Sequence, residues 1–157
     1  MQASREMTVL STAFVMGAPV PLKYTGGGDN LSPPLSWSGL PAGTQSVAVL
    51  CDDPDAPAGD WVHWVLFNLP PATVRLEEGV PARPVLPNGA VQGLNDYAQH
   101  GYDGPWPPPG KPHRYFFKVY ALDAKLNLPA TARKRELPKA LQGHILAQGQ
   151  LHGTFQR

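Results

Sequence analysis

The sequence predicts a mainly β protein: a β-sandwich of two antiparallel sheets with one short helix near its C-terminal end. The 157 residues include 19 prolines and 16 glycines, a share that favours short strands joined by turns over long helices. Residues 61–68 and 113–122 alternate with period two and are largely apolar on both faces, which is typical of central strands covered on each side. Residues 136–146 show the helical spacing of apolar side chains that predicts the helix. Together these observations favour a sandwich with a small helical addition.

The composition is that of one folded domain, which we expect to span residues 1–157. Hydrophobic residues make up 42% and charged residues 16% of the chain, so a disordered chain is excluded and a single core without a linker is favoured. The formal net charge is +1. The longest basic run, Arg133-Lys134-Arg135, is interpreted as a solvated surface turn, so nucleic acid is not an expected partner. No apolar run approaches the roughly 20 residues that a membrane span requires.

Cys51 is the single cysteine of the chain, which excludes an intramolecular disulfide and a cysteine-based zinc site. Its position inside an apolar run predicts a buried, inert thiol rather than a nucleophile. Such cysteine usage fits a reducing compartment, and we expect a cytoplasmic location.

The N-terminal third predicts two strands separated by a long surface segment. Residues 9–15 are interpreted as a first strand, because the polar residues inside this stretch and the lack of a cleavage site argue against a signal peptide. Residues 19–44 are rich in turn-forming residues and are expected on the surface. Residues 46–51 form a short apolar run of strand length, and the acidic, proline-rich segment 52–57 must turn the chain after it.

The two central strands are expected to present different side chains to the two sides of their sheet. In the second of them, His113 and Tyr115 share one face, while Arg114 points to the opposite face, where we expect it to pair with a carboxylate. Residues 149–155 predict a last strand after the helix. Strict alternation divides the first central strand into one face with Trp61, His63, Val65 and Phe67 and another with Val62, Trp64 and Leu66.

Two segments place a histidine at the start of each central strand, next to turns rich in proline. A single histidine there is more typical of a hydrogen-bonded interior residue, and a single aspartate more typical of a turn. Two histidines and two acids at such turns together favour a binding site. The segments are Asp53-Pro54-Asp55-Ala56-Pro57 with Trp61-Val62-His63-Trp64, and Gly101-Tyr102-Asp103-Gly104-Pro105 through Pro107-Pro108-Pro109-Gly110 to His113-Arg114-Tyr115.

These motifs resemble the signature of the phosphatidylethanolamine-binding protein family. That signature pairs an Asp-Pro-Asp-x-Pro turn and a downstream histidine with a Gly-x-x-Pro-Pro loop that leads to His-Arg-Tyr. The resemblance covers about residues 14–155 and implies a β-sandwich with a small pocket at one end for phosphate-like anions, including phospholipid head groups. Further stretches look like its bacterial and archaeal branch of Raf kinase inhibitor-like proteins, namely Leu31-Ser32-Pro33-Pro34-Leu35-Ser36-Trp37, Tyr120-Ala121-Leu122-Asp123 and Gly143-His144-Ile145-Leu146-Ala147.

The resemblance implies a non-enzymatic binding protein with no catalytic residue, no metal ligand and no cofactor. Its expected partner is a phosphate-like anion or a phospholipid head group, and the oligomeric state is left open, a homodimer included. By family analogy, the bond between Ala56 and Pro57 is a candidate for a cis peptide. Carried over to this sequence, the pocket lining would be Asp53, Asp55, Trp61, His63, Gly104, Pro108, His113 and Tyr115.

Physical chemistry assigns different roles to these acids and to the histidines. An ionised carboxylate repels phosphate, so Asp53 and Asp55 are not expected to contact the anion directly. One of them is expected to accept a hydrogen bond from a histidine ring, which fixes the tautomer and favours the protonated form. Histidine N–H groups, the Tyr115 hydroxyl and loop backbone N–H groups would then donate to the anion. The remaining histidines, expected to be structural, are His100, His144 and His152.

Three other functions compete with this interpretation. Metal-dependent hydrolysis would use the two histidines and two aspartates, but the helical histidine spacings of hydrolytic zinc sites are absent from the sequence. A serine hydrolase would need a Gly-x-Ser-x-Gly elbow, which the sequence lacks. The serious competitor is an inhibitor of serine proteases or kinases that acts through its surface, as relatives in the family do. Residues 105–112 would be its exposed, rigid loop.

Overall fold

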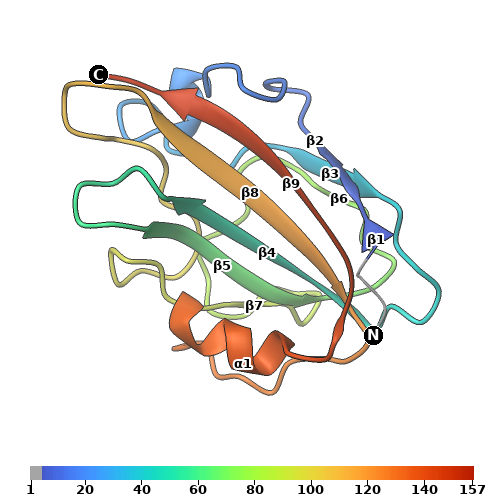
Figure 1. Cartoon of the computed structure of the whole chain (residues 1–157). Coiled ribbons are helices and arrows are strands. Elements are labelled where there is room, and N and C mark those ends of the chain that lie inside the picture. Colours follow the sequence, from blue (N-terminus) through green and yellow to red (C-terminus); the bar gives the residue numbers. More distant parts are fainter. Residues whose placement is uncertain (1–4) are drawn as a thin grey trace.

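The computed structural model describes residues 5–157 and shows two β-sheets that pack against each other (Figure 1). The order of strands is β1-β9-β8-β4-β5-β7 in the larger sheet and β2-β3-β6 in the smaller one. In chain order the elements are β1 (Arg5–Glu6), β2 (Thr8–Leu10), η1 (Leu22–Tyr24), β3 (Leu35–Ser38), β4 (Ser46–Asp53), β5 (Trp61–Leu69), β6 (Arg75–Leu76), β7 (Val91–Gln92), β8 (His113–Leu122), η2 (Lys134–Glu136), α1 (Leu137–Leu141) and β9 (Ile145–Phe155).

The predicted β-sandwich is therefore confirmed, with one departure from antiparallel pairing. β1 runs parallel to β9, and Arg5 lies opposite Ala147. Every other strand pair in the two sheets is antiparallel within the described residues. Among residues 5–157, the helices are too short to cross a membrane.

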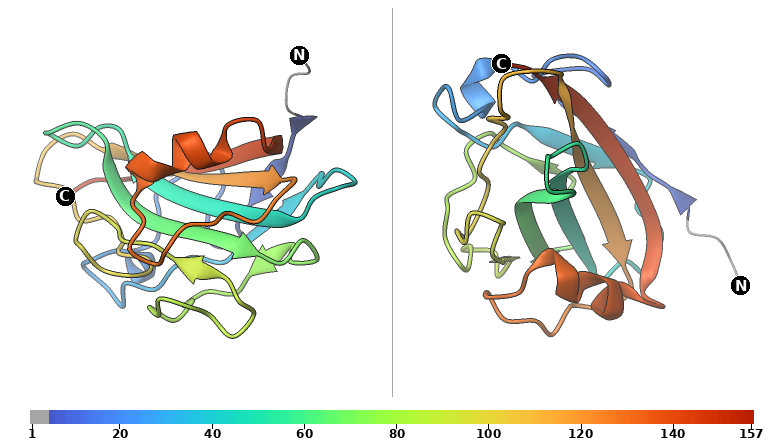
Figure 2. Two further views of the ribbon diagram at one scale, coloured as in Figure 1. Left: turned by 90° about the horizontal axis from the view of Figure 1, so that it is seen from below. Right: turned by 60° about the vertical axis from the view of Figure 1, so that its left-hand side comes forward.

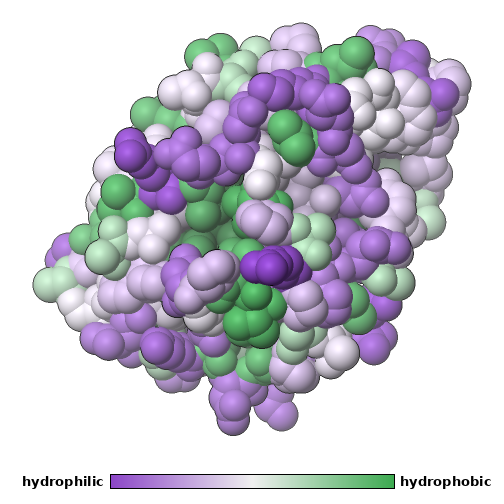
Figure 3. Space-filling model, turned by 180° about the vertical axis from the view of Figure 1, so that it is seen from behind, coloured by the Kyte–Doolittle hydropathy of each residue, from purple (hydrophilic) through white to green (hydrophobic). Residues whose placement is uncertain are grey.

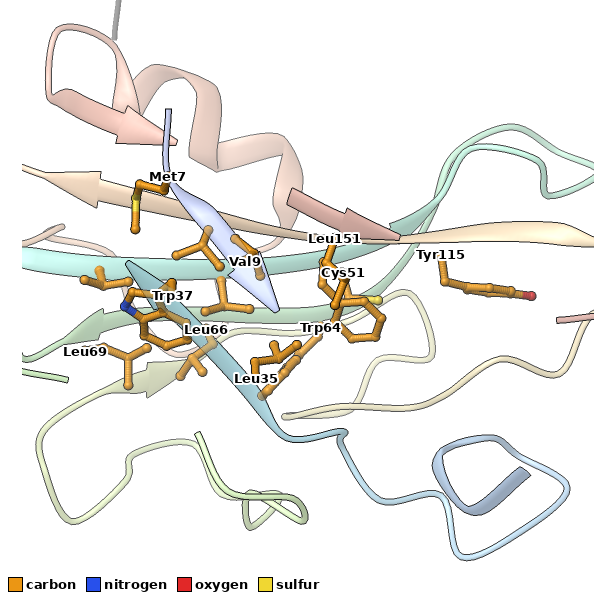
Figure 4. Packing of buried hydrophobic residues seen from close by; sticks show 14 of the residues in the cluster. Met7, Val9, Leu35, Trp37, Cys51, Trp64, Leu66, Leu69, Tyr115 and Leu151 are labelled. Carbon is orange, nitrogen blue, oxygen red and sulfur yellow. The ribbon is translucent and has the colours of Figure 1, made fainter. Parts of the chain in front are cut away.

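The larger sheet separates two apolar cores. One core fills the space between the sheets, where Trp64 and Phe117 are fully buried (Figure 4). The other lies on the opposite face, where Phe67 packs with Leu137 of α1, and α1 covers this side of the sheet (Figure 2). Burying one such large apolar side chain stabilises the fold by about 1.5–3 kcal/mol. Seen from behind, apolar residues gather near the centre of the face, and hydrophilic and apolar residues are mixed around them (Figure 3).

The two predicted central strands and the short strand predicted over residues 46–51 are confirmed, and two of the three are longer than the sequence indicated. β4 continues beyond residue 51 to Asp53, and all eight of its residues are buried because it lies between β5 and β8. β5 ends one residue later than expected, at Leu69, whereas β8 has the predicted bounds. The hydrophobic pattern identifies these strands because both of their faces are covered.

A β-bulge in β5 changes which side chains face the inner core. Cys51 pairs with Trp64 and the next residue of β4 pairs with Val62, so His63 is the extra residue between them. His63 and Trp64 consequently both face the inner side of the sheet, while Val65 joins the core under α1. The strict alternation expected for residues 61–68 is wrong beyond this point, because the extra residue exchanges the two faces.

The elements at the two ends of the chain differ from the sequence prediction. The first strand, expected over residues 9–15, is reduced to β2, because the Ser11 hydroxyl accepts a hydrogen bond from the Ala13 backbone N–H (3.0 Å) and turns the chain away. α1 is shorter than the predicted helix because Gly143 adopts φ of 78° just after it, the usual end of a helix. The last strand then begins earlier than expected, at Ile145.

Lys134 is not the solvated side chain that its basic neighbours suggested. Its ammonium group lies 2.8 Å from the Oδ2 atom of buried Asp52 and also contacts the Asp60 carboxylate. Only 31% of the Lys134 side chain is exposed. The basic run therefore contains a structural ion pair, and the interpretation as a surface turn is wrong for this residue.

Candidate ligand-binding site

A cavity of about 230 Å³ opens at the end of the sandwich where β4 ends and β5 and β8 begin. The three strand ends meet there because β4 is antiparallel to both neighbours, so its last residues lie beside their first ones. Loop residues complete the wall. The lining consists of Asp53, Ala56, Pro57, Ala58, Trp61, His63, Tyr97, Trp106, Pro107, Pro108, His113 and Tyr115.

Asp53 and His113 form a buried pair in the cavity wall. The Asp53 Oδ2 atom lies 2.7 Å from His113 Nδ1, and the two side chains are 4% and 12% exposed. Because the carboxylate accepts a hydrogen bond here, the proton of a neutral His113 is on Nδ1, and Nε2 is the atom that gains a proton when the ring becomes charged. The expectation that an aspartate orients a histidine is therefore met by Asp53.

Tyr115 adds a hydroxyl group beside this pair. Its ring stacks on the His113 ring, with centroids 6.4 Å apart, and only 1% of the residue is exposed. Figure 4 shows the Tyr115 hydroxyl pointing away from the apolar core, toward the end of the sandwich. Burial, together with the nearby Asp53 carboxylate, raises the pKa of Tyr115 well above its ordinary value. The hydroxyl therefore stays protonated and available as a donor.

His63 is the most deeply buried polar group of the wall, with 2% of the residue exposed. Its Nδ1 atom lies 2.5 Å from the backbone carbonyl oxygen of Asp103 and must donate to it. Its ring meets the Tyr115 ring edge-on, with centroids 5.3 Å apart. Burial lowers the pKa of His63 below the ordinary value of 6.5, because desolvation disfavours the charged ring. The lowered pKa favours the uncharged form of the His63 ring at neutral pH.

An aromatic rim surrounds these polar groups. Trp61 and Tyr97 meet edge to face, with ring centroids 5.4 Å apart, and Trp106 completes the rim from the proline-rich loop. Trp106 lies against Gly27, where an added Cβ atom would be 2.2 Å from the indole ring, so only glycine fits there. The Arg157 guanidinium lies 4.2 Å above the same indole. Sequence reasoning missed Tyr97 and Trp106, because nothing local connects an exposed aromatic residue to a site far along the chain.

Six of the eight residues expected in the pocket line the cavity, and two lie outside it. The six are Asp53, Trp61, His63, Pro108, His113 and Tyr115. Gly104 is buried behind the wall, where its N–H donates to the Asn30 side chain (2.7 Å) and an added Cβ atom would lie 2.2 Å from the Tyr24 carbonyl oxygen. Its role is to allow the loop to pack closely.

Asp55 faces away from the cavity and pairs with Arg114, as the alternation of β8 predicted for the arginine. Asp55 accepts hydrogen bonds from the Arg114 backbone N–H (2.9 Å), from Nε (2.9 Å) and from Nη2 (3.0 Å). These bonds lower the pKa of Asp55 to about 2. The idea that Asp55 supports a pocket histidine is not supported by these contacts, because Asp53 makes that bond instead.

The turn between β4 and β5 contains no cis peptide, and the expectation of one between Ala56 and Pro57 is wrong. The reversal is made instead by a turn in which the Gly59 N–H donates to the Ala56 carbonyl oxygen (3.0 Å). Gly59 adopts φ of 104°, a conformation that L-residues rarely take, so this glycine provides the bend.

The other histidines lie outside the cavity lining. His100 Nδ1 is 2.9 Å from the Gln92 carbonyl oxygen, and His144 Nδ1 is 2.7 Å from an Asp123 carboxylate oxygen. Within residues 5–157, no three side chains of His, Cys, Asp or Glu gather closely enough to hold a metal ion. The charged groups of the lining are also few: it contains the Asp53 carboxylate but neither lysine nor arginine. The wall therefore offers neutral donors and histidine rings rather than permanent cations.

Comparison with known sequences gives a consistent set of relatives. The sequence model of the family described as phosphatidylethanolamine-binding protein matches residues 10–156. A UPF0098 protein of Methanothermobacter thermautotrophicus is 48% identical over 151 residues, which cover 96% of this chain and 99% of that protein. A UPF0098 protein of Aquifex aeolicus is 42% identical over 153 residues, covering 96% and 89% of the two chains.

Two solved structures share the fold over nearly their whole length. A phosphatidylethanolamine-binding protein homologue from Chlamydia trachomatis superimposes with a TM-score of 0.88 at 40% identity, covering 98% of this chain and 99% of its own. YbcL of E. coli, described as a new member of the mammalian family, superimposes with a TM-score of 0.89 at 35% identity, covering 97% and 99%. Sequence and fold therefore point to the same family.

Proposed function

Because the chain belongs to the phosphatidylethanolamine-binding protein family, we propose that its cavity binds phosphate-like anions, such as the head group of a phospholipid. The observation that carries this proposal is the hydrogen-bonded pair of Asp53 and His113 beside the protonated Tyr115 hydroxyl. A charged His113 ring donates through Nε2 and Tyr115 donates through its hydroxyl, so two donors lie on one wall of the cavity. Asp53 balances the charge of the ring from behind.

The size and lining of the cavity support a short polar ligand. Its volume of about 230 Å³ is smaller than the roughly 300–1,000 Å³ of sites that hold drug-sized molecules. The aromatic rim of Trp61, Tyr97 and Trp106 gives the mouth an apolar surface against which the carbon atoms next to a phosphate group can pack. A head group is the right size for such a site, whereas an acyl chain must remain outside.

Binding without catalysis is the form of this proposal that the lining supports. The cavity wall contains no serine, threonine, cysteine or lysine, which are the usual nucleophiles of covalent catalysis. Asp53 accepts two hydrogen bonds, one from His113 and one from the Asp55 backbone N–H (2.8 Å), so its oxygens are engaged. We propose a cytoplasmic location as well, because the one thiol, Cys51, is buried and unpaired.

NMR titration with inorganic phosphate and with phosphoethanolamine tests this function. Resonances of His113 and Tyr115 should shift on binding, and His113→Ala should weaken binding about tenfold or more, the loss expected for one charge-assisted hydrogen bond. His144→Ala is a matched control, because His144 also bonds a carboxylate through Nδ1 at 2.7 Å but lies outside the cavity. A folded protein that leaves the His113 and Tyr115 resonances unmoved would refute the proposal.

An inhibitor of serine proteases or kinases is the second candidate function, and one loop favours it. Residues 108–112 are exposed, and Trp106 beside them is 43% exposed. The loop is tethered, because the Gly110 carbonyl oxygen accepts from the Gln156 side chain (2.7 Å) and the Pro107 carbonyl oxygen accepts from Arg157 (3.3 Å). A rigid exposed loop is what a protease cleft requires. Assays of a serine protease panel with excess protein test it, and a lack of inhibition across the panel would exclude this function for proteases.

A further inference from the structure

Two exposed apolar side chains lie next to each other beside the mouth of the cavity. Leu22 of η1 is 55% exposed, and Trp106 of the loop before β8 is 43% exposed. Both flank Gly27, where an added Cβ atom would be 2.2 Å from the Trp106 ring and 3.1 Å from Leu22 Cδ1. Two prolines of the same loop, Pro108 and Pro109, are exposed as well. Leu22, Trp106, Pro108 and Pro109 are called the mouth patch below.

Hydrogen bonds hold the two segments that carry the mouth patch. The Gly26 backbone N–H donates to the Pro105 carbonyl oxygen (2.9 Å) and joins the segments to each other. The Leu22 carbonyl oxygen accepts from the backbone N–H (3.0 Å) and from the hydroxyl (2.9 Å) of Thr25. Figures 1 and 2 show η1, in light blue, beside the loop that leads into β8, at the end of the sandwich where β9 finishes. Adjacent apolar side chains that are exposed and held in place are typical of an interaction surface.

The size of the cavity indicates what this surface meets. A volume of about 230 Å³ accommodates the head group of a phospholipid but not its acyl chains. A lipid removed whole from a bilayer would expose both chains to water, which is strongly unfavourable because every methylene group adds to the cost. The head group is therefore reached while the chains remain in the bilayer, and the residues around the mouth must then touch the membrane.

The side chains of the mouth patch suit the interface of a bilayer. Tryptophan is enriched at the level of the lipid head groups, where its ring meets both apolar and polar groups, and leucine enters the region just below them. The Arg157 guanidinium lies 4.2 Å above the Trp106 indole. An arginine stacked on an interfacial tryptophan places its charge where the lipid phosphates are.

The charges around the mouth patch are of both signs. Lys111 and Arg157 are exposed cations, and Asp29 is an exposed anion. Lys23 of η1 pairs with Glu78 (2.7 Å), which neutralises it. Because this is not a basic surface, apolar contact rather than attraction to anionic lipids must supply most of the binding, and a zwitterionic bilayer should suffice.

We propose that the mouth patch docks this protein on a phospholipid bilayer, so that the cavity takes the head group of a lipid that stays in the membrane. Leu22 and Trp106 enter the interface beside the mouth, and the Arg157 guanidinium lies among the phosphates. A protein partner would cover the patch too, but it would leave the head-group cavity beside it without a role, so the bilayer is favoured. This inference rests on the proposed function, because it assigns the source of the head group that the same cavity binds.

Leu22→Gln separates docking from head-group binding, because Leu22 is not part of the cavity lining. Sedimentation with vesicles of phosphatidylethanolamine and phosphatidylcholine should show about three- to tenfold weaker association of this variant, the value of burying about half of a leucine side chain. Calorimetry should show unchanged affinity for glycerophosphoethanolamine, the same head group without acyl chains. Val74→Gln is the matched control, because Val74 is 48% exposed and follows the end of β5 that is far from the cavity. Its vesicle association should equal that of the unaltered protein.

The outcomes distinguish this inference from the proposed function. Binding of glycerophosphoethanolamine without association with vesicles would overturn the docking surface and leave the function of the cavity standing. Failure of both would overturn both proposals. Vesicle association that Leu22→Gln leaves unchanged would place the membrane contact elsewhere and overturn the inference. If the same variant instead converts a dimer into a monomer, the patch belongs to a second copy of this chain.

Tryptophan fluorescence measures the orientation of the bound protein. Trp37 and Trp64 are buried in the core, so quenching by bromine atoms on the acyl chains of the vesicle lipids reports on Trp61 and Trp106 at the mouth. Brominated lipid should quench the emission of the unaltered protein, and Leu22→Gln should reduce the quenching at the same lipid concentration. Vesicle-bound protein whose emission is not quenched would have its cavity mouth turned away from the bilayer, and the inference would be wrong.

Discussion

Two neighbouring aspartates at the end of β4 face opposite sides of the larger sheet, and their environments are very different. Asp52 points to the outer side, is 1% exposed, and its Oδ2 atom accepts from Lys118 (3.0 Å) and Lys134 (2.8 Å). Asp53 points to the inner side, is 3% exposed, and accepts a hydrogen bond from His113 (2.7 Å). Both are buried carboxylates, but Asp52 faces permanent cations and Asp53 faces a titratable ring.

The difference shows that a buried aspartate can stabilise the fold on one face of the larger sheet and support ligand binding on the other. Lys134 also contacts Asp60, the residue before β5, so the outer network fastens the η2 segment to the two central strands. Within it, the two carboxylates and the two ammonium groups pair with one another. On the inner face, Asp53 balances a ring whose second nitrogen remains free for a ligand. A buried acid whose partner can change its charge beside a cavity is the better indicator of function.

The largest effect is expected for Asp52→Asn. The change leaves Lys118 and Lys134 without the buried counter-charge, and breaking a buried ion pair in this way destabilises strongly. Because both lysine side chains are partly exposed, we expect a loss of about 2–3 kcal/mol in the free energy of unfolding, measured by urea denaturation. Phosphate affinity should be unchanged. Loss of affinity in a folded Asp52→Asn variant would remove the distinction between the two faces.

The converse pattern is expected for Asp53→Asn. An amide can still accept one hydrogen bond from His113, so the free energy of unfolding should fall by only about 1 kcal/mol. Phosphate affinity should fall about tenfold, because the charged His113 ring that donates to the anion has lost its counter-charge. Calorimetry with inorganic phosphate measures this loss. A strongly destabilised variant with normal affinity would show that Asp53 is a structural residue like Asp52.

A pH-dependent stability is expected from His63 on the inner face. Burial lowers its pKa in the folded protein below the unfolded value of 6.5. As the pH falls below 6.5, the unfolded chain takes up a proton that the folded protein does not, so stability decreases, by up to about 1.4 kcal/mol per pH unit. Urea denaturation between about pH 7 and pH 5 should show this decrease, and His63→Asn should reduce it. An identical slope in the variant would contradict a neutral His63.

The central strands could be predicted from the sequence, but the side of the sheet that each of their side chains faces could not. β4, β5 and β8 could be predicted because burial on both sides leaves a clear apolar pattern. The bulge at His63 could not, since an extra residue is recognisable only from the pairing of Cys51 with Trp64. A one-residue insertion is invisible to periodicity, yet it exchanges the inner and outer residues of half a strand.

The candidate site was predicted in outline for a similar reason. The residues at the starts of β5 and β8 could be identified because the strands themselves could be placed. Which of Asp53 and Asp55 enters the cavity could not be predicted, because both belong to one turn. The Asp55 backbone N–H donates to Asp53 Oδ1, and that local geometry directs the two carboxylates apart. Trp106 depends on its contact with Gly27, nearly eighty residues earlier, which no local pattern reveals.

The smallest effect is expected for Asp55→Asn, the residue that sequence reasoning placed in the pocket. Hydrogen bonds from Arg114 lower the pKa of Asp55 from 3.8 to about 2, so the folded protein holds this carboxylate charged where the unfolded chain begins to protonate. The stabilisation is therefore complete above 3.8 and is lost as the pH falls to about 2. Because half of the Arg114 side chain is exposed, solvent screening limits the effect to less than about 1 kcal/mol. Urea denaturation near neutral pH should show this small loss, and the difference from the unaltered protein should shrink as the pH falls from 3.8 through about 2. Phosphate affinity should not change, since Asp55 lies outside the cavity. A marked loss of affinity in Asp55→Asn would mean that the turn between β4 and β5 acts as one unit. Asp55 would then belong with Asp53 among the acids that support binding, and not with the structural Asp52.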